Sequence, residues 1–123
     1  MVLVDTSVWV KHFQEGDLRL QELLSDAEIA SHPFVIGELA CGNIKNRGEI
    51  LSLLQSLPIA QPIDLAEFLY FVEENGLMGT GIGFIDIHLL ASAKLSGIPL
   101  WTFDKKLRAA AMKLDVAYQA YSR

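Results

Sequence analysis

The sequence has little cysteine: Cys41 is the single example among 123 residues. One thiol cannot close a disulfide within the chain, so a disulfide-stabilised secreted domain is excluded and an oxidising compartment is not implied. Cys41 also lies in an apolar helical stretch, which predicts a buried structural thiol rather than a nucleophile.

Long apolar runs are missing as well. No stretch approaches the roughly 18–20 residues that a membrane-spanning helix requires. The N-terminal segment reaches an acid at Asp5 and lacks the basic start and longer apolar stretch of a signal peptide. We therefore expect a soluble cytoplasmic protein that does not associate with a membrane.

Positive charge is scarce. Ten Lys and Arg residues stand against fifteen Asp and Glu residues, which gives a net charge of −5. This balance argues against a protein that coats nucleic acid through positive charge alone. It leaves open an enzyme that handles nucleic acid through local basic patches and metal ions. The length and the ordinary hydrophobic content predict one compact domain over residues 1–123.

Apolar runs and helical periodicities alternate along the chain. Buried strands are expected at residues 2–4, 28–30, 58–63, 99–103 and 116–118. Helices are expected at residues 7–13, 18–26, 33–41, 50–57, 65–75, 84–96 and 105–113. Strands that alternate with helices favour an α/β fold, here a three-layer α/β/α arrangement around a mainly parallel sheet.

Two aspartates follow predicted strands. Asp5 comes directly after the first strand, and Asp104 comes directly after the strand at residues 99–103. Because the carboxyl ends of parallel strands share one edge of a sheet, both side chains are expected at that edge. Each has an alternative role as the N-cap of the helix that follows, and for Asp104 taken alone that alternative is the stronger one.

Two further acids interrupt apolar helices. Glu38 is the only charge between Pro33 and Asn43, and Asp86 lies among core-type residues at 83–93. A carboxylate on an apolar helix is costly unless it is paired or binds a metal ion. The alternatives are a partly exposed stripe or an Arg partner for Glu38, and a favourable first-turn position in the helix dipole for Asp86.

Taken together, Asp5, Glu38, Asp86 and Asp104 predict one acidic cluster. Carboxylates that are brought together repel and raise one another's pKa values unless a cation holds them. Oxygen ligands without a Cys/His cluster favour Mg²⁺ or Mn²⁺ over zinc. Such an ion would polarise a phosphodiester bond and activate water.

Around these acids the sequence resembles the PIN-domain ribonucleases, specifically the VapC-type toxins of toxin–antitoxin pairs. The order and spacing of four motifs carry the resemblance over essentially the whole chain, although each motif alone is weak. The motifs are Val4-Asp5-Thr6-Ser7-Val8-Trp9, Gly37-Glu38-Leu39-Ala40-Cys41-Gly42, Asp86-Ile87-His88-Leu89-Leu90-Ala91-Ser92-Ala93 and Thr102-Phe103-Asp104.

The resemblance implies a PIN-like fold and Mg²⁺- or Mn²⁺-dependent endonucleolytic cleavage of RNA that leaves 5′-phosphate and 3′-hydroxyl ends. It also implies neutralisation by a small antitoxin protein. It places Asp5, Glu38, Asp86 and Asp104 in the metal-binding cluster as catalytic residues.

Two hydroxyl residues, Thr6 and Thr102, resemble residues that support the site in this family. The chain departs from the family pattern just after the fourth aspartate. The family often has an acid or polar group two residues later, followed by Phe, whereas this chain has Lys106 and Leu107. The departure bears on whether a second metal ion binds and on what Asp104 contributes.

The densest basic patch, next to the fourth aspartate, comprises Lys105, Lys106 and Arg108. A solvated helix face is the ordinary interpretation, but cations in the first turn of a helix oppose its dipole. We therefore expect one or more of these residues to contact RNA phosphates. Lys45 and Arg47, just beyond the Glu38 helix, are a weaker second candidate.

Three other features point less clearly to a function. The apolar stripe at residues 68–72 is explained mostly by core packing, with a homodimer or antitoxin surface as the alternative. The glycines at 79–83 lack the context of a phosphate-binding motif and predict a flexible loop. Nothing pairs the three histidines for metal-free acid–base catalysis, so surface or helix N-terminal positions are expected for His12, His32 and His88.

Two rival functions deserve comparison. A phosphoacceptor signalling domain also combines strand-end aspartates with Mg²⁺, but it needs an acidic pair after the first strand and a late strand-end lysine. Here Asp5 stands alone and the late strand ends at Asp104. The second rival is a PIN-like domain that binds RNA or a partner without cleaving it, and the four acids argue against it.

Overall fold

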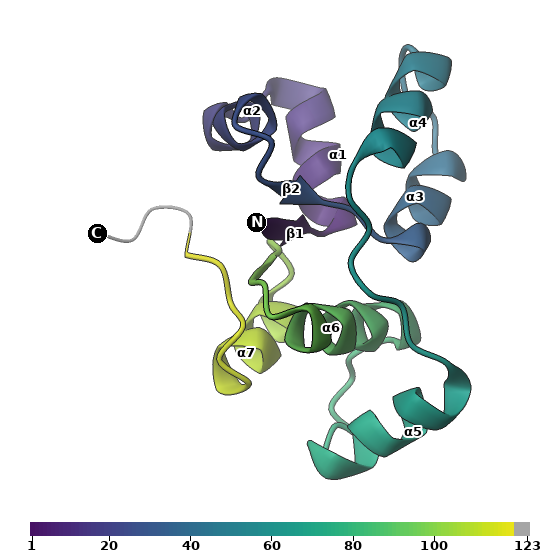
Figure 1. Ribbon diagram of the computed structural model, residues 1–123, viewed down its shortest axis with the longest axis vertical. Coiled ribbons are helices and arrows are strands. Elements are labelled where there is room, and N and C mark those ends of the chain that lie inside the picture. The colour runs from purple at the N-terminus through teal and green to yellow at the C-terminus, as the bar shows by residue number, and fades with distance from the viewer. Residues whose placement is uncertain (120–123) are drawn as a thin grey trace.

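The computed structural model describes residues 1–119, which form three short strands and seven helices (Figure 1). The strands are β1 (Val2–Val4), β2 (Ile29–Ala30) and β3 (Leu100–Trp101). The helices are α1 (Thr6–Glu15), α2 (Leu18–Ser25), α3 (Pro33–Ala40), α4 (Arg47–Ser56), α5 (Leu65–Glu74), α6 (Phe84–Ser96) and α7 (Lys105–Lys113).

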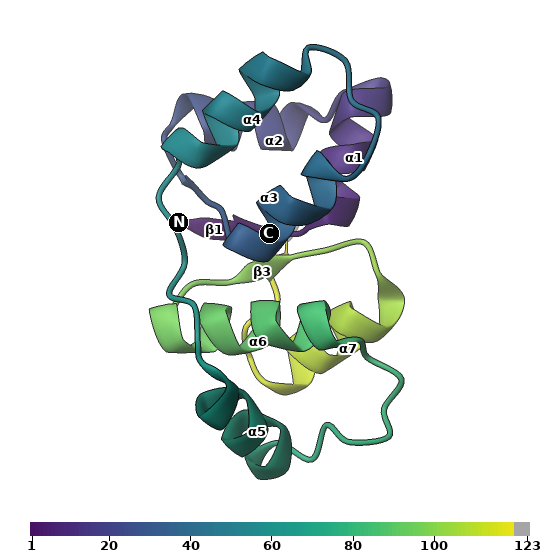
Figure 2. The same ribbon diagram turned by 90° about the vertical axis from the view of Figure 1, so that its right-hand side faces the viewer.

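The three strands form one parallel sheet in the order β2-β1-β3. Helices α1 to α4 lie on one side of the sheet and α6 and α7 on the other, while α5 lies outside α6 (Figures 1 and 2). This arrangement confirms the predicted three-layer α/β/α fold. Because all strands run the same way, the segments that follow β1, β2 and β3 gather at one edge.

The core forms where apolar strands meet apolar helix faces. All three residues of β1 are buried, and Trp9 on α1 and Leu89 and Leu90 on α6 are almost inaccessible to water. Burial of such side chains stabilises the fold by roughly 1.5–3 kcal/mol each relative to exposure. The core therefore fixes α1 and α6 against the sheet.

Local sequence explains where the helices of that edge begin and end. His32 caps α3 by accepting the Phe34 N–H at Nδ1 (3.0 Å), and Pro33 occupies the first helical position, where it needs no N–H. Asp104 caps α7 through the Leu107 N–H at 2.8 Å. Gly97 ends α6 in the left-handed conformation, with φ of 68°.

Two predicted strands are not strands. Residues 58–63 contribute only an isolated bridge between Ser31 and Ile59, and residues 116–118 contribute only a bridge between Leu100 and Ala117. Both segments are apolar enough to pack beside the sheet, but each pairs for too short a distance to form a ladder. The sheet is consequently narrower than the sequence predicted.

The predicted burial of Cys41 is wrong, because its side chain is exposed. α3 buries Val35 and Leu39, and the chain turns away from the core where the helix ends at Cys41. Among residues 1–119, no helix combines the length and the apolar character needed to cross a membrane.

Candidate active site

Asp5 lies at the carboxyl end of β1 and is 4 % exposed. The register of the sheet pairs Val4 with Trp101, so Asp5 and Thr102 are the next residues on neighbouring strands. The Asp5 Oδ2 atom accepts hydrogen bonds from Thr102 Oγ1 at 2.6 Å and from Ser7 Oγ at 2.8 Å. Asp5 does not cap α1 with its side chain. These two hydroxyls therefore fix the orientation of the buried carboxylate.

The same hydroxyls hold the segment that follows β3. Thr102 Oγ1 accepts the Asp104 N–H at 3.0 Å, and Ser7 Oγ accepts the Phe103 N–H at 3.0 Å. The sequence predicts a supporting position for Thr102 but assigns no role to Ser7. The signal for Ser7 was its position two residues after Asp5, in the first turn of α1.

Glu38 lies on α3 and is exposed, which corrects the expectation of a carboxylate buried in an apolar helix. The apolar residues of α3 are concentrated on other faces, so the Glu38 side chain reaches solvent. Its Oε1 atom accepts a hydrogen bond from Thr6 Oγ1 at 2.6 Å. Thr6, at the start of α1, therefore links the Glu38 side chain to the corner that holds Asp5.

Asp86 lies in the first turn of α6 and is partly buried. Burial, followed by the charges of Asp5, Asp104 and Glu38, raises the pKa of Asp86 to about 6. Asp5, Asp104 and Glu38 therefore lie in the neighbourhood of Asp86, close enough for their charges to act on it. Among the described residues 1–119, Asp86 has no ion-pair partner and its carboxylate accepts no hydrogen bond.

Asp104 uses one carboxylate oxygen in the structure of α7. Its Oδ1 atom accepts the Leu107 N–H, which makes it the N-cap that the sequence offered as an alternative role. Its charge also contributes to the raised pKa of Asp86. The Asp104 side chain can therefore cap α7 and at the same time act on Asp86 through its charge.

The donors in this cluster suit a hard divalent cation. All four charged groups are carboxylates, and Mg²⁺ and Mn²⁺ prefer oxygen ligands while keeping several water molecules. Within the part of the chain that the structure describes, no three His, Cys, Asp or Glu side chains form a preassembled metal cage. A bound cation would nevertheless offset both the burial of the Asp86 charge and its repulsion by the other acids, so the residues fit such an ion.

Most predicted RNA-contacting residues are accessible. Lys105, Lys106 and Arg108 are exposed on α7, beside Asp104, and Lys45 is exposed before α4. Arg47 is different, since its guanidinium donates hydrogen bonds to the backbone carbonyls of Ala40 at 2.5 Å and Gly42 at 3.2 Å. It therefore satisfies carbonyls at the end of α3.

Two histidines are buried at the helices that carry Glu38 and Asp86. His32 occupies the predicted helix N-terminal position, and its Nε2 atom lies 3.1 Å from Ser92 Oγ on α6. It therefore links the helix of Glu38 to the helix of Asp86. Burial, with a smaller contribution from the charge of His88, lowers the pKa of His32 to about 4.

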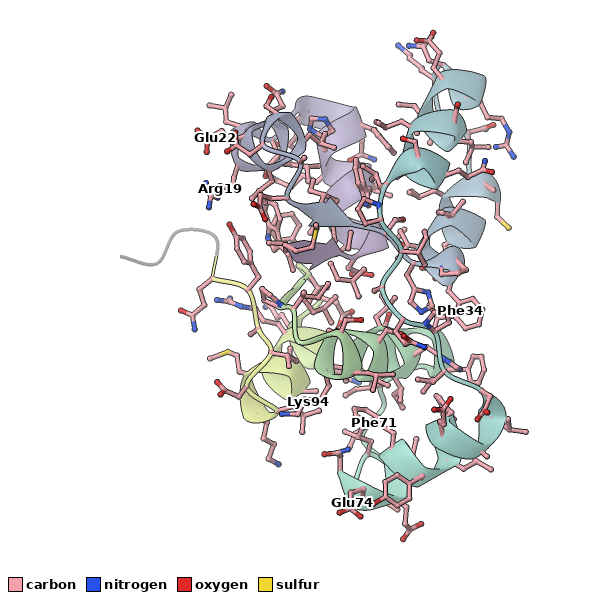
Figure 3. All side chains as sticks on the ribbon, viewed as in Figure 1. Arg19, Glu22, Phe34, Phe71, Glu74 and Lys94 are labelled. Atoms are coloured by element: carbon pink, nitrogen blue, oxygen red, sulfur yellow. The ribbon has the colours of Figure 1, made fainter. Side chains whose placement is uncertain are left out.

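The expected surface or helix N-terminal position of His88 is wrong. His88 is 5 % exposed and stacks on Phe68, with ring centroids 4.5 Å apart. The rings of Phe34 and Phe84 contact it edge-on at 4.8 Å and 4.6 Å. Phe34 lies at the side of α3 that faces α6 (Figure 3). Through these rings His88 packs α3, α5 and α6 together. Burial also lowers its pKa.

The family model that matches this chain is that of the PIN domain, and it covers residues 2–113. Among curated proteins, Ribonuclease VapC32 of Mycobacterium tuberculosis is 47% identical over 118 residues, which cover 95% of each chain. The same values hold for the protein in strain CDC 1551 / Oshkosh and in strain ATCC 25618 / H37Rv.

Solved structures share this fold at low sequence identity. FitAcB from Neisseria gonorrhoeae is 21% identical with a TM-score of 0.62, and the match covers 100% of both chains. FitAB bound to the IR36 DNA fragment is 17% identical with a TM-score of 0.62, over 100% of this chain and 97% of the other. PAE2754 from Pyrobaculum aerophilum is 21% identical with a TM-score of 0.60, over 89% of this chain and 78% of the other.

Proposed function

Because the chain belongs to the PIN-domain family and is a homologue of the VapC ribonucleases, we propose that it is a Mg²⁺- or Mn²⁺-dependent endoribonuclease toxin controlled by a cognate antitoxin. The observation that carries the metal-dependent part is the convergence of four carboxylates with the Asp86 pKa raised to about 6. The name of the relative supports RNA as the substrate.

In this proposal Asp5, Glu38, Asp86 and Asp104 are the catalytic residues that hold the ion. Thr102 and Ser7 orient Asp5 through their hydrogen bonds, and Thr6 does the same for Glu38. Such supporting contacts fix the direction of a ligand oxygen before the ion arrives, which lowers the reorganisation that binding requires.

When bound, a divalent ion supplies Lewis-acid polarisation of the scissile phosphate and lowers the pKa of a coordinated water. The chain's own contribution is to hold negative oxygens where the cation and the phosphate meet. The partly buried position of Asp86 also restricts water there, which strengthens electrostatic interactions. Cleavage is expected to leave 5′-phosphate and 3′-hydroxyl ends.

Basic residues beside the cluster are proposed to bind the RNA backbone. Lys105, Lys106 and Arg108 on α7 form the main surface, and Lys45 is a second contact. Arg47 is the weakest candidate, because its guanidinium is already engaged by the end of α3.

We further propose that a second copy of the chain docks on the exposed face of α5. Phe68 is buried as expected for core packing, but Leu69 and Tyr70 are 58% and 68% exposed. A groove of about 420 Å³ between α5 and α6 adjoins them, with Phe71 and Lys94 among its lining residues (Figure 3). An apolar patch of this kind is typical of an interaction surface.

Light scattering tests the homodimer. Leu69→Lys should convert a dimer to a monomer, whereas Leu18→Lys, at a 78% exposed position on α2, should not. A monomeric unsubstituted chain would contradict the proposed homodimer. Repeating the measurement with the co-expressed antitoxin tests whether the antitoxin uses the same face.

Cleavage of total RNA by the purified chain tests the enzymatic proposal. We expect activity with Mg²⁺ or Mn²⁺, none with EDTA, and a loss of about 100-fold or more in Asp5→Asn. Activity that survives both EDTA and the substitution would exclude the proposed site. No cleavage under any condition would favour a PIN-like domain that binds RNA without cutting it, and 2′,3′-cyclic phosphate ends would contradict the proposed chemistry.

A further inference from the structure

A groove of about 270 Å³ lies between the segment at residues 75–82 and helix α7. Its charged lining residues are Lys106 and Lys113, and no acidic side chain lines it. Asn75 and Thr80 add polar groups, over an apolar floor that includes Leu77. In a chain with a net charge of −5, this groove is therefore a local site of positive charge.

Both lysines that line the groove are unpaired within residues 1–119. Among the described residues 1–119, no carboxylate lies within 4.0 Å of either ammonium group, and neither group donates a hydrogen bond to the protein. Lys106 also lies in the first turn of α7, where a cation opposes the helix dipole. Its position is thus not explained by the stability of the helix.

Gly81 leaves the space that the end of the Lys106 side chain occupies. The Gly81 backbone is in the left-handed region, with φ of +81°. A Cβ atom at this position would lie 2.8 Å from Lys106 Nζ and 3.7 Å from its Cδ and Cε atoms. Any side chain at residue 81 would therefore displace the end of Lys106, whereas glycine lets it lie against the loop.

The groove also adjoins the acidic cluster. Lys106 is two residues after Asp104, and Gly81 is two residues before Gly83, which caps the helix of Asp86. Helices α6 and α7 pack against each other, and Asp86 and Asp104 lie at or next to their first turns. A strand bound at Asp104 would therefore run beside the helix that carries Lys106.

From these observations we infer that the groove binds a phosphate of the RNA strand next to the cleavage site, with Lys106 as the contact and Gly81 as its positioning residue. This inference rests on the proposed function for its substrate class. A phosphodiester supplies the negative charge that the two lysines lack in the fold, and single-stranded RNA can follow an open groove.

Binding of a short fluorescent single-stranded RNA of mixed sequence, measured by anisotropy in EDTA over a range of salt concentrations, tests the inference without cleavage. Lys106→Gln should weaken binding by about three- to tenfold and reduce the slope of log K against log salt by about 0.7, the value for one phosphate contact. Gly81→Ala should reproduce most of this loss.

The double variant distinguishes positioning from general damage. If Gly81 acts through Lys106, Gly81→Ala should add nothing in the Lys106→Gln background. Gly79→Ala is the matched control, because Gly79 has a similar φ of +73° but nothing within 4 Å of its Cβ position. It should introduce the same backbone strain, visible as a similar drop in Tm, while leaving RNA affinity and the salt slope unchanged.

The inference is overturned if Lys106→Gln binds as well as the unsubstituted chain, if the two losses are fully additive, or if Gly79→Ala and Gly81→Ala weaken binding equally. Absence of RNA binding by the unsubstituted chain overturns it too. Since binding is measured in EDTA, these outcomes are independent of the cleavage assay. The proposed ribonuclease site and this groove can therefore fail separately.

Discussion

The two sides of the acidic cluster are built differently. Asp5 is held by hydroxyl donors from α1 and from the end of β3, and these hydroxyls are in turn hydrogen-bonded to the backbone of the next segment. Asp86 has neighbours of like charge and no such donors among residues 1–119. Hydrogen bonds of the fold therefore fix the Asp5 carboxylate, whereas the charged Asp86 carboxylate is destabilised unless a cation binds beside it.

This contrast predicts opposite effects on stability for two matched substitutions. Asp86→Asn removes a desolvated, repelled charge and should stabilise the metal-free chain at neutral pH by about 1–3 kcal/mol. Asp5→Asn breaks charge-assisted hydrogen bonds and should destabilise it by about 1–3 kcal/mol. Both should lower RNA cleavage by about 100-fold or more. Urea unfolding in EDTA measures the stability of both variants, and cleavage with Mn²⁺ measures their activity. If both substitutions changed the stability in the same direction, the predicted difference between Asp5 and Asp86 would be wrong.

Acid should weaken the link between α3 and α6 behind the cluster. The pKa of His32 is about 4 in the fold and 6.5 in its ordinary state, so the unfolded chain binds more protons between these values. Stability from His32 is therefore complete above pH 6.5 and is lost as the pH falls toward 4, by up to about 3 kcal/mol.

The control for this prediction is His32→Asn, which can still cap α3 but does not titrate in this range. Its free energy of unfolding should depend less on pH between 4 and 6.5 than that of the unsubstituted chain. Burial lowers the pKa of His88 as well, so a residual slope of the same sign is expected. Equal slopes in both proteins would exclude His32 as the source.

Thr102→Val tests the hydrogen bonds that hold Asp5 without removing a carboxylate. The substitution keeps the shape of the side chain but removes the donor to Asp5 and the acceptor for the Asp104 N–H. Metal affinity in the cleavage assay should fall by about 10- to 100-fold, as for other groups that orient ligands. Ser56→Ala removes a hydroxyl that donates to Leu53 on α4 and should leave metal affinity unchanged.

The smallest expected effects are those of substitutions at Arg47, which should change stability, and at Lys45, which should change RNA affinity. Arg47→Gln should lower stability by about 1 kcal/mol or less through lost hydrogen bonds at the end of α3. Lys45→Gln should instead lower RNA affinity with no change in Tm. If Arg47→Gln weakened RNA binding more than Lys45→Gln did, the proposed basic surface would have to be extended to Arg47.

The residue pattern along the chain predicted most of the helices and strands, but not how far each strand pairs with its neighbours in the sheet. Periodicity located the helices because it acts within a few turns, as do the observed caps Asp64 of α5 and Gly97 of α6. Residues 58–63 and 116–118 carry the composition of strands, but whether they pair depends on how far each runs beside a neighbour. That distance is a property of the assembled sheet.

The same distinction applies to the site. Strand-end positions placed Asp5 and Asp104 near each other, since parallel topology alone brings them to one edge. The hydrogen bonds of Ser7 depend on side-chain directions across two strands, and the burial of His88 depends on rings from three helices. Neither could be obtained from spacing along one element.

The Asp5–Thr102 hydrogen bond joins residues 97 positions apart. A ribosome must therefore translate through Thr102 before this hydrogen bond can form. A nascent or truncated product would carry Asp5 and Glu38 but not the hydroxyl that holds the first of them. If Asp5 acts as proposed, the order of synthesis delays its orientation until residue 102 has been added.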